Sequence, residues 1–374
     1  MDFTPKQRML NAYRGLFSDR PPVAPEFWYL FPAKVLGVSM VEFEREVPFW
    51  QALQTTFLKY GTEGWGAAFP DVIHPDVEKQ SRFLKTTETR YRESIIHRYK
   101  GKILESSQIY DMQEPSWVEK HLVEDMADLP ICMDMLLDPA VELDFTRVNK
   151  AHAAVGEDYL LEMWMGNPFF DFFGSMMGFE KAVDYFITES VEKLEADRER
   201  YINHQKRFIR KVCENTPFES FAIGCSYSCN SLLGPNLWRQ WDKPYIKAMA
   251  DEIHAHGKLL HVHFHGRAME TVADFAEIGI DCVCPFERSP GGDVDGLAGL
   301  KQVRTLLDDK VTMNGNVHTV ETLIRGTPED ARNEVRQIRN AFAGSARFII
   351  GTGDQVGRET PEDNIWAMID EAKR

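Results

Sequence analysis

The strongest constraint on the fold is a regular alternation of short apolar runs with longer helical patterns, which begins near residue 158. The apolar runs have the length of buried strands, and they lie near residues 160, 220, 260, 282, 313 and 349. Two further strands are expected upstream, over residues 22–30 and 61–69. Eight strands separated by helices favour an α/β fold of the closed (β/α)8 TIM-barrel type over an open doubly wound sheet.

The open-sheet alternative also lacks the glycine signature of dinucleotide-binding folds, since no G-x-G-x-x-G follows the first strand. The barrel pattern continues to the end of the chain. One helical stretch is expected over residues 178–212, and two late helices are expected to start at Thr327-Pro328 and near Thr360-Pro361. We therefore expect residues 1–374 to form a single TIM-barrel domain.

Residues 84–115 interrupt this alternation. Their pattern is typical of an antiparallel meander, with Lys100-Gly101 as one of its turns. We expect this segment to be a β insertion in the barrel. It would form a lid or a surface for a partner.

Charge and composition exclude some classes of partner. The net charge of -15 and the absence of a basic block argue against binding to nucleic acid or to an anionic membrane. No apolar run reaches the ~18 residues of a membrane span, and the first residues lack the apolar core of a signal peptide. The cysteines are too few and too irregular for a disulfide framework, so we expect a cytoplasmic protein: they are Cys132, Cys213, Cys225, Cys229, Cys282 and Cys284.

Three histidines alternate along the apolar run near residue 260. Side chains two residues apart on a strand point to the same face, so His261, His263 and His265 are expected to lie in one row. The run ends at Gly266, and the carboxyl end of a barrel strand is where such folds place their reactive groups. A metal or catalytic role is therefore expected, although one or two of these rings could instead be buried and hydrogen-bonded to backbone.

Carboxylates follow other strands and are expected at the same mouth of the barrel. His263, His265 and a carboxylate, Asp354 or Glu287, would make a three-ligand site with one open position, as in catalytic zinc sites. The glycine-rich loop around Asp354 favours a cation, although the residue could simply form a turn. Glu287 could be a ligand, a general base, or a partner of Arg288.

Two cysteines could replace one of these ligands. A thiolate from Cys225 or Cys284 would suit zinc. The simpler interpretation of Cys282 and Cys284 is that they are small buried residues of a central strand. The ligand set stays open on this point.

Residues 167–178 are dense in phenylalanine and methionine, and they cannot all face one side of a helix. Core packing explains about half of them, and the remainder could line an apolar pocket at the barrel mouth. The residues expected to bind substrate there are Asn167, Phe169, Phe172, Met176 and Asn316.

Several motifs together resemble the uroporphyrinogen decarboxylase superfamily, in order and spacing. They are Thr4-PKQRMLNAYRG, Gly166-NPFFDFFGSMMGFE, His263-FHG, Asn314-GNV and Thr360-PEDNIWAMI. The resemblance extends over nearly the whole chain and implies a TIM barrel. It is specific for the superfamily and leaves two activities to consider.

The first activity is that of uroporphyrinogen decarboxylase itself, a cofactor-free enzyme that holds substrate carboxylates with N-terminal arginines and an aspartate. Residues 26–37 offer no matching pair of arginines, and only Asp71 lies near the expected aspartate position. The second is that of corrinoid-dependent methyltransferases, whose zinc is held by a His-x-Cys pair and a later cysteine. In this chain His263-Phe264-His265 and Asp354 stand at or near those positions.

The resemblance therefore implies a zinc-dependent methyltransferase that moves a methyl group to the corrinoid (cobalamin) of a partner protein. Nitrogen and oxygen ligands make zinc harder than thiolates do, so a methoxylated aromatic or another methyl ether is the expected donor. Glu287 would orient the substrate or supply a proton. The alternatives are a metal-free decarboxylase of a porphyrinogen or aromatic acid, which would use Arg267 and Arg288, and a non-catalytic binding barrel.

Overall fold

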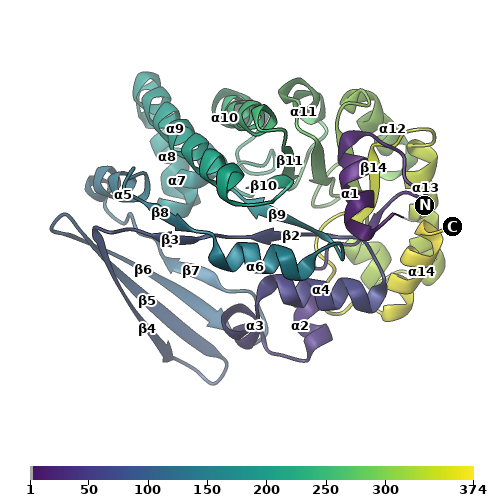
Figure 1. Ribbon diagram of the computed structural model, residues 1–374, viewed down its shortest axis with the longest axis horizontal. Coiled ribbons are helices and arrows are strands. Elements are labelled where there is room, and N and C mark those ends of the chain that lie inside the picture. Colours follow the sequence, from purple (N-terminus) through teal and green to yellow (C-terminus); the bar gives the residue numbers. More distant parts are fainter. Residues whose placement is uncertain (1–2) are drawn as a thin grey trace.

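A curled, eight-stranded parallel sheet forms the centre of the protein in the computed structural model, which describes residues 3–374 (Figure 1). All eight predicted strands are present, because parallel strands covered on both faces have continuous apolar sequences. The strands are β1 (Val23–Ala24), β2 (Trp65–Ala68), β9 (Leu160–Trp164), β10 (Ser220–Cys225), β11 (Leu259–Phe264), β12 (Cys282–Pro285), β13 (Thr312–Val317) and β14 (Phe348–Thr352).

The strand order is that of a barrel, β1-β14-β13-β12-β11-β10-β9-β2, and all of its ladders are parallel. Within residues 3–374, β1 and β2 are the two edges, and no backbone ladder joins them. The prediction of a closed barrel is therefore confirmed only as a barrel-like α/β fold. We refer to the gap between β1 and β2 as the seam.

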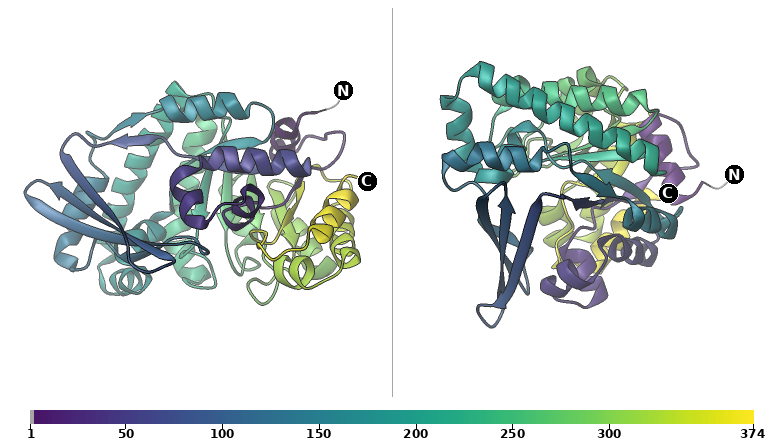
Figure 2. Two further views of the ribbon diagram at one scale, coloured as in Figure 1. Left: turned by 90° about the horizontal axis from the view of Figure 1, so that it is seen from below. Right: turned by 60° about the vertical axis from the view of Figure 1, so that its left-hand side comes forward.

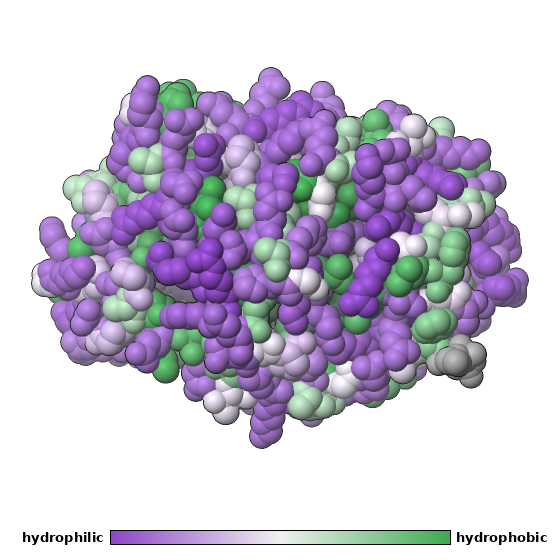
Figure 3. Space-filling view, turned by 45° about the horizontal axis from the view of Figure 1, so that its top comes forward, coloured by the Kyte–Doolittle hydropathy of each residue, from purple (hydrophilic) through white to green (hydrophobic). Residues whose placement is uncertain are grey.

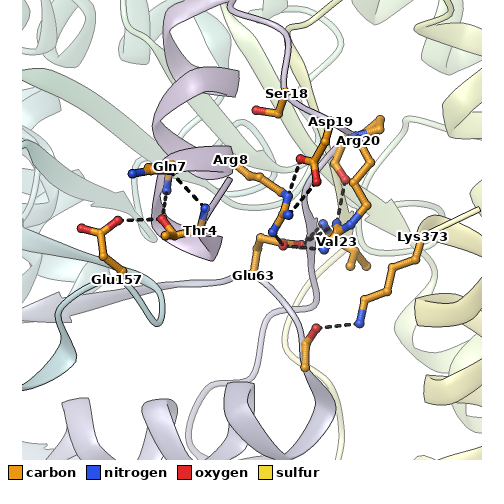
Figure 4. A network of polar contacts seen from close by, with 12 residues as sticks. Thr4, Gln7, Arg8, Ser18, Asp19, Arg20, Val23, Glu63, Glu157 and Lys373 are labelled. Atoms are coloured by element: carbon orange, nitrogen blue, oxygen red, sulfur yellow. Dashed lines mark hydrogen bonds and ion pairs between the residues drawn. The ribbon is translucent and has the colours of Figure 1, made fainter. Parts of the chain in front are cut away.

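Side chains bridge the seam where a backbone ladder does not. Glu63, just before β2, is 1% exposed, and its carboxylate accepts a hydrogen bond of 2.8 Å from the backbone N–H of Val23 in β1. The same carboxylate also accepts hydrogen bonds from Arg8 and Arg20 (Figure 4). These donors meet the cost of burying the charge.

Helices cover the outside of the sheet (Figure 1). The predicted helix over 178–212 is two helices, because Ser190 caps a new start. Thr327 forms the expected capping box, whereas the last helix is capped by Pro361 without a side-chain bond. The helices are α1 (Pro5–Arg14), α2 (Leu30–Leu36), α3 (Met40–Glu46), α4 (Phe49–Tyr60), α5 (Leu129–Leu136), α6 (Thr146–Val155), α7 (Phe169–Met177), α8 (Phe179–Thr188), α9 (Val191–Asn215), α10 (Pro235–Ala255), α11 (Val272–Ile278), α12 (Gly296–Leu307), α13 (Pro328–Ala341) and α14 (Glu362–Ala372).

The interior of the curled sheet has its own hydrophobic cluster. Tyr13 of α1 packs there with Trp65, Leu160 and Ile349, which come from strands on both sides of the seam. Helix α1 lies against the sheet at its amino-terminal end, where the Thr312 hydroxyl donates a hydrogen bond to the carbonyl of Ala12. The interior is therefore a packed core, and space for chemistry is left at the carboxyl ends of the strands.

The predicted insertion is a separate antiparallel sheet of β4 (Val77–Lys85), β5 (Arg90–Tyr99), β6 (Lys102–Asp111) and β7 (Trp117–Lys120). The turn at Lys100-Gly101 is confirmed, since Tyr99 pairs with Lys102. The sheet begins earlier than residue 84, because β4 is largely exposed and polar and shows no apolar pattern. Figure 2 shows these strands projecting from the barrel-like body. A short ladder joins β3 (Asp71–Ile73) to β8 (Glu142–Asp144).

The surface agrees with the acidic composition of the chain. Figure 3 shows a face on which hydrophilic residues predominate and hydrophobic ones are scattered. Among residues 3–374, no helix has both the length and the apolar character that a bilayer span requires.

Replacing Glu63 tests the bridge across the seam. We expect Glu63→Gln to lower the free energy of unfolding by about 3 kcal/mol, because two arginines lose their buried counter-charge. Glu105→Gln removes an exposed partner of Lys120 and should change stability by less than about 0.5 kcal/mol. Urea titration followed by circular dichroism measures both, and equal effects of the two variants would contradict the assigned role of Glu63.

Candidate active site

The three alternating histidines lie in one row, as predicted. His261 is fully buried, His263 is 8% exposed, and His265 follows the end of β11 and is partly exposed. The sulfur of Cys284 in β12 lies 3.0 Å from both His261 Nε2 and His263 Nδ1. The Nε2 atoms of His263 and His265 are 2.8 Å apart. The row therefore runs from the core of the barrel to its carboxyl-terminal mouth.

The predicted carboxylates meet this row at the mouth. His265 Nδ1 lies 2.9 Å from Glu287 Oε1, which also accepts a hydrogen bond from the backbone N–H of Gly266. His265, Glu287 and Asp354 each offer one donor atom within 4.8 Å of the others. The structure thus brings the predicted ligands His263, His265 and Asp354 into one connected cluster with Glu287, which we call the mouth cluster.

A further carboxylate, Glu26, belongs to this region and was not among the predicted site residues. Glu26 follows β1, is 5% exposed, and places Oε1 3.9 Å from His263 Nε2. It forms a second set of potential ligands with His263 and Cys284. Its backbone N–H donates to the hydroxyl of Thr352, which anchors it to β14. An acidic residue inside the apolar segment 22–30 was the signal that could have identified it.

Burial and neighbouring charges set the carboxylate pKa values. Burial raises the pKa of Glu26 well above its usual range, and the charge of Asp354 raises it further. Burial also raises the pKa of Asp354, and His265 only partly offsets this. For Glu287, burial is outweighed by the hydrogen bonds from His265 and from the N–H of Gly266, so its pKa is lowered.

The two adjacent imidazoles are driven in opposite directions. Burial lowers the pKa of His265, but the hydrogen bond to Glu287 and the charge of Asp354 raise it more, to about 9. Burial and the proximity of His265 and His261 lower the pKa of His263 far below its usual value. In the metal-free protein at neutral pH, the protonated His265 therefore donates its Nε2–H to the lone pair of His263 Nε2.

The aromatic residues predicted to bind substrate lie in the core instead. Phe169, Phe172 and Met176 belong to α7 and are at most 9% exposed. The ring of Phe172 stacks on that of Tyr201, with centroids 4.3 Å apart. These contacts correct the prediction of a substrate-covering role, because α7 is buried on nearly all its sides. Asn167 contributes its backbone carbonyl, which accepts a hydrogen bond from the Tyr201 hydroxyl.

Asn316 also has a different place from the predicted one. Its side chain is fully buried, and its Nδ2 group donates to the carbonyls of Phe286 and Val294. Its Oδ1 accepts a hydrogen bond from Arg288, and Arg288 also pairs with Glu334. Asn316 therefore ties together the loop after β12, and it is not a free substrate-binding group.

The remaining predicted groups divide between the mouth cluster and the rest of the barrel. Cys284 contacts two of the histidines, and burial raises the pKa of its thiol well above the usual value. Burial also raises the pKa of Cys225, which lies outside both sets of potential ligands. Of the arginines named for a decarboxylase, Arg288 is engaged with Asn316 and Glu334, and Arg267 is exposed.

A family model for uroporphyrinogen decarboxylase (URO-D) matches residues 109–374, well over half of the chain. The chain belongs to the uroporphyrinogen decarboxylase family. This confirms the predicted family. The matched region includes strands β9 to β14 and, with them, every residue of the mouth cluster.

Solved structures share the fold at low sequence identity. A methyltransferase from Methanosarcina mazei is 14% identical, with a TM-score of 0.62, and the match covers 100% of this chain and 99% of that chain. A prolidase is 13% identical over 60% of this chain and 61% of its own, with a TM-score of 0.32. A dipeptide epimerase from Methylococcus capsulatus has a TM-score of 0.27, at 10% identity over 79% of each chain. No curated protein sequence matches the chain.

The assignment of Asn316 to the loop can be tested by its removal. We expect Asn316→Ala to destabilise the protein by about 2–3 kcal/mol, because two buried carbonyls lose their donors. Asn333→Ala, on the exposed side of α13, should have an effect below about 0.5 kcal/mol. Thermal unfolding compares the two, and an unchanged melting temperature for Asn316→Ala would restore the substrate-binding interpretation.

Proposed function

We propose that the protein is a zinc-dependent methyltransferase of the uroporphyrinogen decarboxylase family. It moves a methyl group from a methoxylated aromatic or another methyl ether to the corrinoid (cobalamin) of a partner protein. The observation that carries this proposal is the mouth cluster, in which two imidazoles and two carboxylates meet at the carboxyl end of the sheet. The fold shared over its full length with a methyltransferase supports it.

The donor groups suit a divalent cation. His263, His265, Glu287 and Asp354 would hold the ion, through nitrogen and oxygen atoms of the kind that zinc accepts. Burial and mutual repulsion raise the pKa values of Asp354 and of the neighbouring Glu26, so the site favours a positive charge. When bound, zinc supplies a Lewis acid that polarises the ether oxygen and stabilises the departing oxyanion.

The protein groups orient one another for this task. Glu287, fixed by the N–H of Gly266, holds His265 through Nδ1 and so directs its Nε2 toward His263. Because the pKa of Glu287 is lowered, it is ionised at neutral pH, and we assign it an orienting role rather than that of a proton donor. His263 is neutral, and its Nε2 faces the other members of the mouth cluster.

Metal content tests the proposed ligands directly. We expect purified protein to hold about one zinc ion per chain, and His265→Ala and Asp354→Ala to lose most of it, because each removes a donor atom. His256→Ala removes a histidine of α10's carboxyl end that pairs with Glu252 and should leave the zinc content unchanged. Elemental analysis after gel filtration measures this. Equal zinc content in all four proteins would remove both residues from the ligand set.

Methyl transfer tests the reaction. We expect the wild-type protein to methylate cobalamin in the Co(I) state with a methoxybenzoate as donor, followed by the absorbance change of the corrinoid. His265→Ala should reduce the rate at least about 100-fold because the Lewis acid is lost, whereas His256→Ala should not. Zinc-loaded protein that transfers no methyl group from any methyl ether, or that releases carbon dioxide from an aromatic acid, would contradict the proposed activity.

A further inference from the structure

A continuous chain of polar contacts leads from the mouth cluster into the core of the barrel. His263 Nδ1 lies 3.0 Å from the sulfur of Cys284, which lies 3.0 Å from His261 Nε2. His261 Nδ1 in turn lies 2.9 Å from Glu162 Oε2, on β9. Glu162 and His261 are fully buried, and Cys284 is 2% exposed. These three residues lie outside the predicted reaction chemistry, so their polar contacts call for an explanation.

The direction of each hydrogen bond follows from the far end of the chain. Ser220 Oγ donates to Glu162 Oε1 at 2.6 Å, and an ionised carboxylate only accepts, so His261 Nδ1–H donates to Glu162 Oε2. In a neutral imidazole the other nitrogen then carries a lone pair. His261 Nε2 therefore accepts from the S–H of Cys284. The sulfur of Cys284 is left to accept from His263 Nδ1–H.

We propose that Glu162, His261 and Cys284 are positioning residues that hold His263 in its Nδ1–H tautomer, with the lone pair of Nε2 directed at the metal. This inference rests on the proposed metal site and adds the group that prepares its most buried ligand. The tautomer of a ligating histidine is set by the hydrogen bond of its other nitrogen. Here a thiol makes that bond, and a buried carboxylate fixes the thiol's direction through a second histidine.

The packing around the row keeps the rings in this arrangement. The indole of Trp65 contacts both imidazoles, with ring centroids 4.6 Å from His261 and 5.6 Å from His263. The β11–β12 ladder pairs His263 with Cys284 in register. Neither the rings nor the thiol can turn without disturbing a packed interior, so the directions of the hydrogen bonds persist.

The chain supplies a matched control for Cys284. Cys282 lies two residues earlier on the same strand, is fully buried, and pairs in register with His261. Its thiol makes no hydrogen bond to either histidine among the described contacts. Cys282→Ala therefore reproduces the loss of a buried thiol beside His261 without interrupting the chain of contacts.

The first measurement reads the tautomers in metal-free protein. Long-range ¹H–¹⁵N correlation spectra of ¹⁵N-histidine-labelled protein distinguish Nδ1–H from Nε2–H rings. We expect His261 and His263 to be Nδ1–H in the wild type, in Cys284→Ser and in Cys282→Ala. In Cys284→Ala, His261 keeps its tautomer because Glu162 still accepts its proton, whereas His263 becomes a mixture of both forms.

The second measurement is zinc affinity, by competition with a chromophoric chelator. Loss of an outer hydrogen-bond partner typically weakens metal binding 10–100-fold, and we expect that loss in Cys284→Ala. Cys284→Ser should bind within about 3-fold of the wild type, because a hydroxyl also donates and accepts. Cys282→Ala should also bind within about 3-fold, because it leaves the chain of contacts intact.

The outcomes separate this inference from the proposed function. An Nε2–H ring at His263 in the wild type, or equal losses of zinc affinity in Cys284→Ala and Cys282→Ala, would overturn the positioning role even if zinc binds. A wild-type protein that binds no zinc would overturn the metal site and, with it, this inference, whatever the tautomer. The expected tautomers together with the expected order of affinities would support both.

Discussion

The buried carboxylate of Glu63 maintains the curl of the central sheet, and the site depends on that curl. β1 and β11 are four strands apart in the sheet, so in a flat sheet their ends would lie about 19 Å from each other. In the curled sheet, Glu26 beyond β1 lies 3.9 Å from His263 at the end of β11. Since no ladder joins β1 to β2, the ion pairs and the N–H bond of Glu63 hold the two edges together.

The sequence was most informative where local pattern and burial agree. The strands were predicted correctly because strands covered on both faces must be apolar throughout, and the row of histidines followed from the two-residue period of a strand. The pairing of Lys100-Gly101 as a turn was equally local. Asp354 and Glu287 were placed near the histidines by the rule that barrel strands share one reactive end.

What the sequence did not predict depends on contacts between distant segments. The open seam follows from a two-residue strand, β1, whose edge partner is replaced by the side chain of Glu63. Phe172 and Asn316 have the composition expected of a pocket wall, and only their neighbours show that they serve the core and a loop. The contribution of Glu26 depended on the curl itself, and the direction of the bond at Cys284 depends on Glu162, more than 120 residues away in the chain.

The inserted sheet has a consequence for how the protein behaves at high concentration. β4 is an edge strand, nine residues long and largely exposed, so its backbone N–H and C=O groups could pair with the edge of another molecule. It carries Glu78, Lys79, Arg82 and Lys85, and burying these charges in an intermolecular sheet is unfavourable. The projecting strands can therefore extend into solvent without promoting aggregation from this edge.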